Sequence, residues 1–451
     1  MTSLNVAAWK EWLAPRERQL QRLAIGVAAI VFVVQWIRAV AKLDDGDFFL
    51  HWKFATRFVH HEWLYADGLH IPYPPFWAMA WSPIAAVSLA AAKTLVYPLS
   101  LAALAALLYV LDKLTSRWLP LHGSRLFWAT TLALALISRF LVRELPECGP
   151  NLLLLALSWL AVYLWTRRQD WLAGGCLGLA TAMKCTPALF IAYFAWKRQW
   201  KLAVTSTVAA GLFTLAPALW QGPTDYSRHL QFWLANVRAS AGQNDPSRGV
   251  LGEEELKNLS LRPAAARFLM RLPANHISRV DHPAYLEFLD FSPPMADRII
   301  KLLLLALVAA AAWAFRGPVA DRGGLTIVWE CAGVSTLILL LSPITWSQHC
   351  VALLPAFYLV SRSALVRGKP PEWMIHVLTV YVVVNLLLNR GLIGRDWTML
   401  LGSYHLPTLT FLGVLAVVIG CARRESQLTP AAAIGLGQSS EPCVESRNKA
   451  A

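Results

Sequence analysis

Residues 23–41, LAIGVAAIVFVVQWIRAVA, form an almost uninterrupted apolar run that leads directly into a polar one. Residues 43–77 then read LDDGDFFLHWKFATRFVHHEWLYADGLHIPYPPFW, with three aspartates within four positions. An α-helix needs about 20 apolar residues to cross a bilayer, so the first run predicts a membrane span. Carboxylates at the mouth of a span are expected to face water or to take part in chemistry. The acidic loop is therefore the first candidate for a functional site.

The composition of the whole chain extends this reading to all of its 451 residues, of which 57% are hydrophobic and 15% are charged. Soluble domains carry about 25% charged residues, so the composition predicts an all-α polytopic membrane protein. Because hydropathy windows blur short or broken helices, we expect about 11–13 transmembrane helices. The predicted spans lie near residues 23–41, 73–92, 94–112, 126–143, 150–166, 171–195, 202–220, 298–315, 325–343, 348–361, 373–389 and 405–421.

The net charge of +14 has an ordinary explanation in such a protein. Basic residues cluster beside the apolar runs, as the positive-inside rule predicts, so no nucleic-acid partner is expected. The excess that remains in the loops placed outside suits an anionic lipid-phosphate substrate. The 7 cysteines have no spacing that is typical of a metal site or a disulfide framework.

The chain is predicted to have one membrane domain, residues 23–424, between a cytoplasmic segment, 1–22, and a disordered cytoplasmic tail, 425–451. Its outer loops would be residues 42–72 and 221–297. Within the first, Phe48 to Trp63 have the periodicity of an amphipathic helix on the membrane surface, with His51 and Arg57 on its polar side. The second is long enough to hold short helices of its own, and we expect them between Glu253 and Arg271.

The triplet Asp45-Gly46-Asp47 has two interpretations. Paired carboxylates can hold a divalent cation or supply a general base. Alternatively, Asp47 simply caps the helix that begins at Phe48. The local pattern favours the cap, whereas a position at the outer end of the first span, facing a cavity, favours catalysis.

Two further polar groups interrupt apolar runs. Lys184 stands near the middle of residues 171–195, where Pro187 predicts a broken helix that lines a cavity. The Lys184 side chain either extends along the helix so that its ammonium group lies at the membrane surface (snorkelling), or it binds an anionic group. His349 follows Ser342-Pro343 and Trp346 between two spans, and is either a headgroup-level histidine or a proton-transfer or phosphate-binding group.

Several segments, taken in order, resemble glycosyltransferase family 87, the polyprenyl-phosphate-sugar-dependent transferases of the GT-C class. No single segment is specific, but their order and spacing are. In one place the chain departs from the pattern, because Pro150 stands where the family usually has glutamine, which puts any role of that amide in doubt. The matching segments are Asp47-Phe48, Tyr73-Pro74-Pro75-Phe76, Gly149-Pro150-Asn151-Leu152, Ala173-Gly174, Gly178-Leu179-Ala180, Lys184 to Pro187, Asn258-Leu259-Ser260-Leu261, and Ser342-Pro343 with Trp346 and His349.

The resemblance implies a GT-C-type bundle in the cytoplasmic (inner) membrane with an active site that faces outward. A hexose, often mannose, would pass with inversion from a polyprenyl-phosphate donor to a hydroxyl of a glycolipid or glycan acceptor. Asp47 would be the general base and His349 a second catalytic group. No cofactor and no metal are expected, because the donor has no diphosphate. The substrate-binding candidates are Tyr73, Asn151, Lys184, Asn258, Ser260, Arg262 and Trp346.

Two other functions remain open on the sequence alone. A transporter or flippase of lipid-linked sugars would use Asp47, Lys184 and His349 as a substrate or ion path, but the chain has no internal repeat of the kind that many transporters contain. A non-catalytic assembly protein would use residues 221–297 as a docking surface. No nucleotide-binding or zinc-protease motif occurs, so those enzyme classes have no support.

Overall fold

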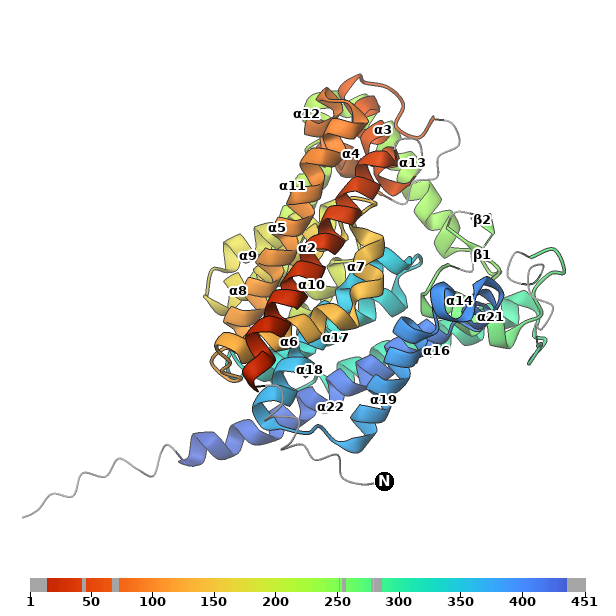
Figure 1. Cartoon of the computed structure of the whole chain (residues 1–451). Helices are drawn as coiled ribbons and strands as arrows, with labels where there is room; N and C mark the ends of the chain where they lie inside the picture. Colours follow the sequence, from red (N-terminus) through yellow and green to blue (C-terminus); the bar gives the residue numbers. More distant parts are fainter. Residues whose placement is uncertain are drawn as a thin grey trace, which may run out of the picture.

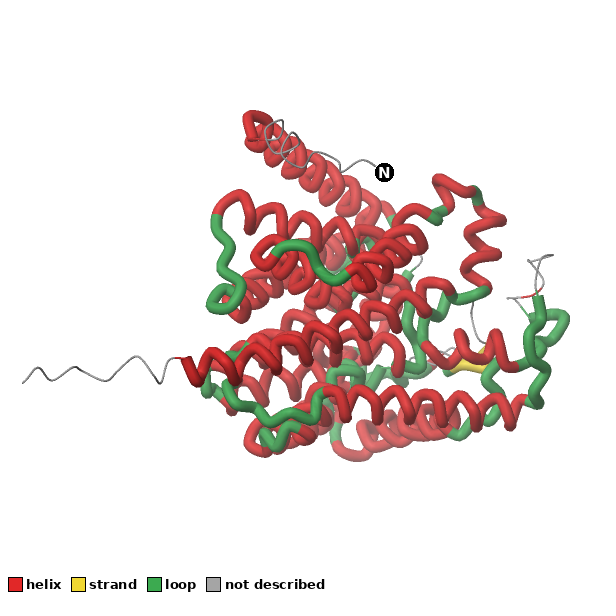
Figure 2. Tube along the Cα trace, turned by 90° about the horizontal axis from the view of Figure 1, so that it is seen from below, coloured by secondary structure: helices red, strands yellow, loops and turns green. Residues whose placement is uncertain are grey.

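A computed structural model of the chain describes residues 14–42, 46–66, 73–250, 252–253, 257–276, 279 and 286–435. Within these ranges it is built from helices, with one two-stranded antiparallel sheet in the loop region (Figure 1). Figure 2 shows the same predominance of helix, with loops gathered around the short strands at one side. The predicted all-α architecture is confirmed.

The first half of the chain contains the elements up to residue 221. In order they are η1 (Ala14–Arg16), α2 (Glu17–Ala41), α3 (Asp47–Val59), α4 (Phe76–Trp81), η3 (Ser82–Ala86), α5 (Leu89–Thr115), α6 (Gly123–Leu136), α7 (Ser138–Glu144), α8 (Asn151–Thr166), α9 (Asp170–Met183), α10 (Ala188–Trp196), α11 (Trp200–Leu215) and α12 (Ala218–Gln221).

The second half begins with the long outer loop and ends with a long helix. Its elements are α13 (Pro223–Ala241), β1 (Arg248–Gly249), β2 (Gly252–Glu253), α14 (Leu261–Leu269), α16 (Pro293–Ala314), α17 (Leu325–Leu341), η4 (Ser347–Leu353), α18 (Leu354–Arg367), α19 (Glu372–Val382), the π-helical turn η5 (Val383–Leu387), α20 (Arg390–Ile393), α21 (Arg395–Ser403) and α22 (Leu406–Gly435).

The helices are those of a multi-pass membrane protein. Five described segments are long and apolar enough to cross a bilayer, and α6 with α7 forms a sixth that is bent by 70°. The helices α8, α17 and α19 with η5 are apolar but shorter. Large apolar side chains of α2 are exposed, Ile30 to 65%, as expected where a helix faces lipid. Because length and composition alone decide these assignments, the total of about 11–13 spans stays a prediction.

Residues 73–92 do not form the single span that the sequence predicted. The chain here makes the short helix α4, the 3₁₀ turn η3 and an extended residue at Val87 before α5 begins. Pro83 lies in the first turn of η3, and Ser88 caps α5 by accepting a hydrogen bond from the Ala91 amide at 3.4 Å. These start and stop signals interrupt the apolar run, and α4 and η3 pack against α3 instead.

The predicted helix in the first outer loop is confirmed as α3, but its predicted polar side is partly wrong. His51 and Arg57 are buried, since α3 packs against other elements on that side too. Arg57 donates hydrogen bonds to the carbonyl oxygens of Leu64 and Ala66, both at 3.2 Å. The helix is therefore a packed wall of the protein, which amphipathicity alone does not distinguish from a surface helix.

The predicted break in residues 171–195 is confirmed. Helix α9 ends at Met183, Lys184 has an extended backbone (φ −151°, ψ 126°), and α10 begins at Ala188 after Pro187. Proline disfavours helix in the residue before it, which fixes the break at this point. The extended residue turns the lysine side chain away from the helix axis and into the interior.

The long outer loop contains more helix than the sequence predicted. The expected helix between Glu253 and Arg271 is α14, but α13, with 19 residues, was not expected. At the other end of the chain, α22 continues to Gly435, past residue 425 where the tail was placed. The rest of that tail lies outside the described residues, as do the first 13 residues of the N-terminal segment.

Close packing of α9 against α11 depends on two glycines. A Cβ atom at Gly174 would overlap the side chain of Thr205. At Gly178 it would lie 2.5 Å from the Cβ of Ala209 and 2.8 Å from backbone atoms of Ser206 and Ala210. The neighbouring Gly175 has open space around it. The pattern of small residues therefore fixes the distance between the two helices.

We expect Gly178→Ala to destabilise the protein by about 1–3 kcal/mol, because the added methyl group meets backbone atoms that cannot move aside. The matched control is Gly175→Ala, which should leave stability unchanged or raise it by up to about 1 kcal/mol through helix propensity. Thermal unfolding of both variants in detergent is the measurement. Equal midpoints for the two variants would contradict the packing argument.

Candidate active site

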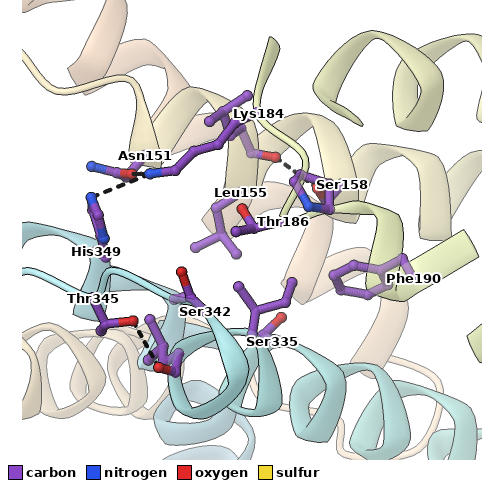
Figure 3. A pocket seen from close by; sticks show the side chains of 15 residues that line it. Asn151, Leu155, Ser158, Lys184, Thr186, Phe190, Ser335, Ser342, Thr345 and His349 are labelled. Atoms are coloured by element: carbon purple, nitrogen blue, oxygen red, sulfur yellow. Dashed lines mark hydrogen bonds between the residues drawn. The ribbon is translucent and has the colours of Figure 1, made fainter. Parts of the chain in front are cut away.

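A cavity lies where α8, the break between α9 and α10, α17 and η4 meet. About 510 Å³ there is free of atoms, part of it open to solvent. Figure 3 shows Asn151, Lys184 and His349 converging on one side, with Phe190 and Ser335 on the other. The remaining lining residues are Leu154, Leu155, Ser158, Thr186, Pro187, Ile338, Leu339, Ser342, Thr345 and Ala352. The cavity is thus polar where the lysine enters and largely apolar beyond it.

Three of the predicted site residues come together at the polar side. The Nζ atom of Lys184 donates to Oδ1 of Asn151 at 3.2 Å and lies 3.2 Å from Nε2 of His349. The Trp346 amide donates to the other ring nitrogen of His349, Nδ1, at 3.2 Å. A neutral imidazole that accepts at Nδ1 carries its proton on Nε2. The ammonium group and the Nε2–H group are then two donors in contact with each other, and an anionic oxygen beside them could accept a hydrogen bond from each.

Glu144 holds Asn151 in this position. Its Oε1 accepts from the backbone amides of Asn151 at 2.8 Å and Leu152 at 3.3 Å, so it caps the first turn of α8. Its Oε2 accepts from the Asn151 side chain at 2.8 Å, which leaves the Asn151 oxygen free to face Lys184. A Cβ atom at Gly149 would collide with this carboxylate, so a side chain at that position would have to displace it.

Asp47 is the first residue of α3 and lies beside the cavity. Its Oδ2 accepts a hydrogen bond of 2.7 Å from Nε2 of Gln348, the residue before His349. Its backbone amide donates to Oε2 of Glu147 at 3.3 Å, and Glu147 pairs with Lys42 at 2.9 Å. Gly46 has φ +107°, and a side chain there would strike Glu147. Asp47 and Lys184 are close enough to interact electrostatically.

Tyr73 forms an aromatic wall of the same site. Its ring stacks on Trp77 with centroids 4.3 Å apart, and Nζ of Lys184 lies 5.6 Å from the ring centre. Burial, followed by the nearby carboxylates of Asp47 and Glu144, raises the pKa of its phenol well above the usual range. Tyr73 therefore keeps its proton, and its neutral ring lies beside the lysine.

The remaining candidates hold the outer loop in place. Asn258 is buried, donates to the Pro343 carbonyl at 2.9 Å and accepts from the amides of Ser260 and Thr345. Arg262 donates to the carbonyl oxygens of Arg248 and Asp245. These contacts connect the loop to the segment before η4 and to the β-hairpin. A substrate contact of Asn258, Ser260, Arg262 or Trp346 stays a prediction.

Sequence reasoning missed Glu144, Glu147 and Gln348. The two glutamates lie in the short segment between the predicted spans at 126–143 and 150–166, to which no role was given. Two acids before Gly149-Pro150, at the entrance to an apolar run, were the available signal. The sequence around Gln348 contains no such signal, because its hydrogen-bond partner, Asp47, is 301 residues away.

The described residues contain no group of three or more His, Cys, Asp or Glu side chains that could hold a metal ion. Asp44 and Asp45 lie outside the described residues, so the Asp45-Gly46-Asp47 triplet is not seen as a unit. Metal-independent activity stays a prediction.

Comparison with known proteins places this architecture in a class of membrane enzymes. The model of glycosyltransferase family 87 matches residues 71–343, more than half of the chain. The match includes Tyr73, Asn151 and Lys184 but ends before His349 and begins after Asp47. No solved structure matches the chain significantly.

Curated relatives from mycobacteria are similar over most of the chain. The polyprenol-phosphate-mannose-dependent alpha-(1-2)-phosphatidylinositol mannoside mannosyltransferase of Mycobacterium tuberculosis is 28% identical over 65% of this chain. The match spans 62% of that relative, less than two thirds of its length. The protein of the same name in Mycolicibacterium smegmatis is 28% identical over 76% of each chain. The corresponding pentamannoside mannosyltransferase of M. smegmatis is 27% identical over 79% of this chain and 80% of its own length.

The chain therefore belongs to glycosyltransferase family 87, and its helices are those of a multi-pass membrane protein. The family predicted from the sequence is confirmed. The same finding favours an enzyme over the transporter and assembly-protein alternatives.

Glu144 gives a test of the site's architecture that does not depend on activity. We expect Glu144→Ala to destabilise the protein by about 1–3 kcal/mol, because buried donors at the start of α8 lose their acceptor. Glu144→Gln should cost less, since its oxygen can still cap the helix. Thermal unfolding in detergent is the measurement, with the exposed Glu372→Ala as the control. A Glu144→Ala midpoint equal to that of the control would show that the cap contributes nothing.

Proposed function

We propose that this protein transfers a hexose from a polyprenyl-phosphate carrier to a hydroxyl group of a glycolipid or glycan acceptor, with inversion at the anomeric carbon. Mannose is the favoured sugar, because the names of the mycobacterial relatives state a polyprenol-phosphate-mannose donor. The same names state phosphatidylinositol mannoside acceptors, which makes a glycolipid the favoured acceptor class.

The observation that carries the proposal is the pairing of a cation with an apolar cavity. Lys184 and His349 present two donors at the polar side, where a phosphate would accept hydrogen bonds from both. Leu154, Leu155 and Phe190 supply apolar surface on the far side, which suits the first units of an isoprenoid chain. An amphiphilic donor with a phosphate joined directly to a lipid has this combination of groups.

Asp47 is the group best placed to act as general base. An inverting transfer needs a carboxylate that removes the acceptor proton while the hydroxyl oxygen attacks the anomeric carbon. The hydrogen bond from Gln348 fixes Oδ2 of Asp47, while its Oδ1 accepts no hydrogen bond from the described residues. The new carbon–oxygen bond forms as the bond to the phosphate oxygen breaks, and the acceptor proton moves to Asp47.

The leaving group is polyprenyl phosphate, which carries away the bonding electron pair. A donor pair that is already in place stabilises this developing charge without reorganising in the transition state. Lys184 is held by Asn151, and Asn151 is held by Glu144, so the cation is positioned before substrate binds. This arrangement makes Lys184 and His349 the residues that act on the phosphate.

The site is proposed to open on the outer side of the cytoplasmic membrane. Three basic residues, Arg16, Arg18 and Arg22, stand at the beginning of α2, against two, Arg38 and Lys42, at the other end, which Asp47 follows. Basic residues prefer the cytoplasmic side of a span. The end of α2 that leads to Asp47 then faces outward, which supports this orientation.

Asp47→Asn is the direct test of the general base. We expect transfer to fall about 10²–10⁴-fold, because the amide cannot take the acceptor proton. Its oxygen can still accept from Gln348, so folding and donor binding should stay near wild type. The assay uses purified protein, radiolabelled polyprenyl-phosphate mannose and an acceptor lipid extract. Asp225→Asn, an exposed change on α13, serves as the control. Full activity of Asp47→Asn would exclude this residue as the base.

Lys184→Met tests the phosphate site separately. Removing the ammonium group should weaken donor binding about 10–100-fold, the usual effect of losing a hydrogen bond to a charged group. The affinity for polyprenyl-phosphate mannose is the measurement, and the exposed Lys369→Met is the matched control. Unchanged donor affinity would return Lys184 to a structural role.

A further inference from the structure

His51 lies one helical turn after Asp47, on the same face of α3, because residues four apart in a helix are neighbours. Only 3% of its surface is exposed. Its ring packs against Tyr73 at 5.2 Å and Trp77 at 4.8 Å between centroids. Helix α3 is not one of the candidate membrane spans. A polar side chain is therefore enclosed by aromatic rings directly beside the proposed base.

The hydrogen bond to Trp77 fixes which nitrogen of His51 carries the proton. Nε1 of Trp77 lies 3.1 Å from Nδ1 of His51, and an indole N–H group can only donate. Nδ1 must therefore be the acceptor, so the proton is on Nε2. Burial, with a smaller contribution from the positive charge of Lys184, lowers the pKa of His51 to about 3. The ring is then neutral near pH 7 and presents one N–H donor.

That donor has no partner among the described residues. Nε2 of His51 is buried and makes no hydrogen bond to any residue that the structure describes. A buried donor without an acceptor lowers the stability of the folded protein by about 1–3 kcal/mol, so an unsatisfied N–H group of this kind requires an explanation. Among the described residues, His51 is the histidine of this kind that adjoins the site, because Tyr73, which contacts its ring, also contacts Lys184.

We propose that Nε2–H of His51 donates a hydrogen bond to a sugar hydroxyl oxygen next to the reacting centre. This inference rests on the proposed glycosyl transfer and adds a substrate-binding residue to it. A neutral donor among aromatic rings suits a hydroxyl group better than a phosphate, which Lys184 and His349 already serve. Both the transferred sugar and a sugar of the acceptor offer such an oxygen, and separate kinetic measurements distinguish them.

The central variant is His51→Phe, which keeps an aromatic ring but removes the donor. We expect the KM of one substrate to rise about 10-fold, with little change in kcat, because one hydrogen bond to bound substrate is lost. A higher KM for the acceptor assigns the hydroxyl to the acceptor sugar, and a higher KM for the donor assigns it to the transferred sugar. If neither KM changes, the proposal is wrong.

A purely structural role of His51 makes a different prediction. If its only task were to accept the Trp77 N–H group, His51→Phe would have no further effect once Trp77 is changed to Phe. The proposal instead expects the same rise in KM in the wild-type and Trp77→Phe backgrounds. His51→Gln supplies a second comparison, because its amide can donate and accept, and it should recover part of the lost affinity. Loss of the KM effect in the double variant would overturn the proposal.

A binding measurement separates failure of this inference from failure of the proposed function. If the wild-type protein shows no turnover of polyprenyl-phosphate mannose, the reaction or its substrate is wrong, but His51 is still testable. The probe is then octyl mannoside, with thermal stabilisation in a detergent of different headgroup as the readout. Stabilisation of the wild type that falls markedly in His51→Phe supports the sugar contact. Equal stabilisation of both proteins, or none of either, contradicts it.

Discussion

The charge of an ammonium group inside a membrane protein needs hydrogen-bond acceptors in place of water. The contacts that supply them to Lys184 determine much of this site. The break between α9 and α10 brings its side chain to the start of α8, where Asn151 accepts its hydrogen bond. Asn151 can do so because Glu144 holds its amide group in the required orientation. A buried charge costs several kcal/mol unless it is paired and hydrogen-bonded. Asn151 and Glu144 compensate the cost of removing the Lys184 charge from water, and together they form the polar side of the cavity.

The two acidic residues before α8 serve the two sides of this site. Glu144 turns Asn151 towards the lysine, and Glu147 contacts the backbone of Asp47. Both carboxylates also satisfy amide groups at helix starts, one at α8 and one at α3, where unpaired N–H groups gather. The glycines at positions 46 and 149 leave room for them. The geometry of the site is in this way tied to the stability of two helix termini.

The sequence predicted the features that depend on local chemistry. Pro187 beside Lys184 indicated the break, and the apolar runs indicated a polytopic helical protein. The prediction of one span at 73–92 was wrong, because the high average apolarity of these residues outweighed the turn and capping signals at Pro83 and Ser88. The polar side of α3 was misplaced because periodicity does not reveal a second packing partner. Contacts such as that between Asp47 and Gln348 join distant parts of the chain and leave no local trace.

The same Asp47–Gln348 hydrogen bond bears on how the protein is made. Its partners are 301 residues apart, so the ribosome has completed most of the chain before they can meet. Membrane helices that are inserted early therefore carry an acidic loop and a half-buried lysine, Lys184, whose final neighbours are still missing. Surfaces that are exposed for a time during folding make the intermediates of large proteins prone to aggregation. Biogenesis of this enzyme accordingly depends on insertion of its C-terminal third, the part that supplies η4.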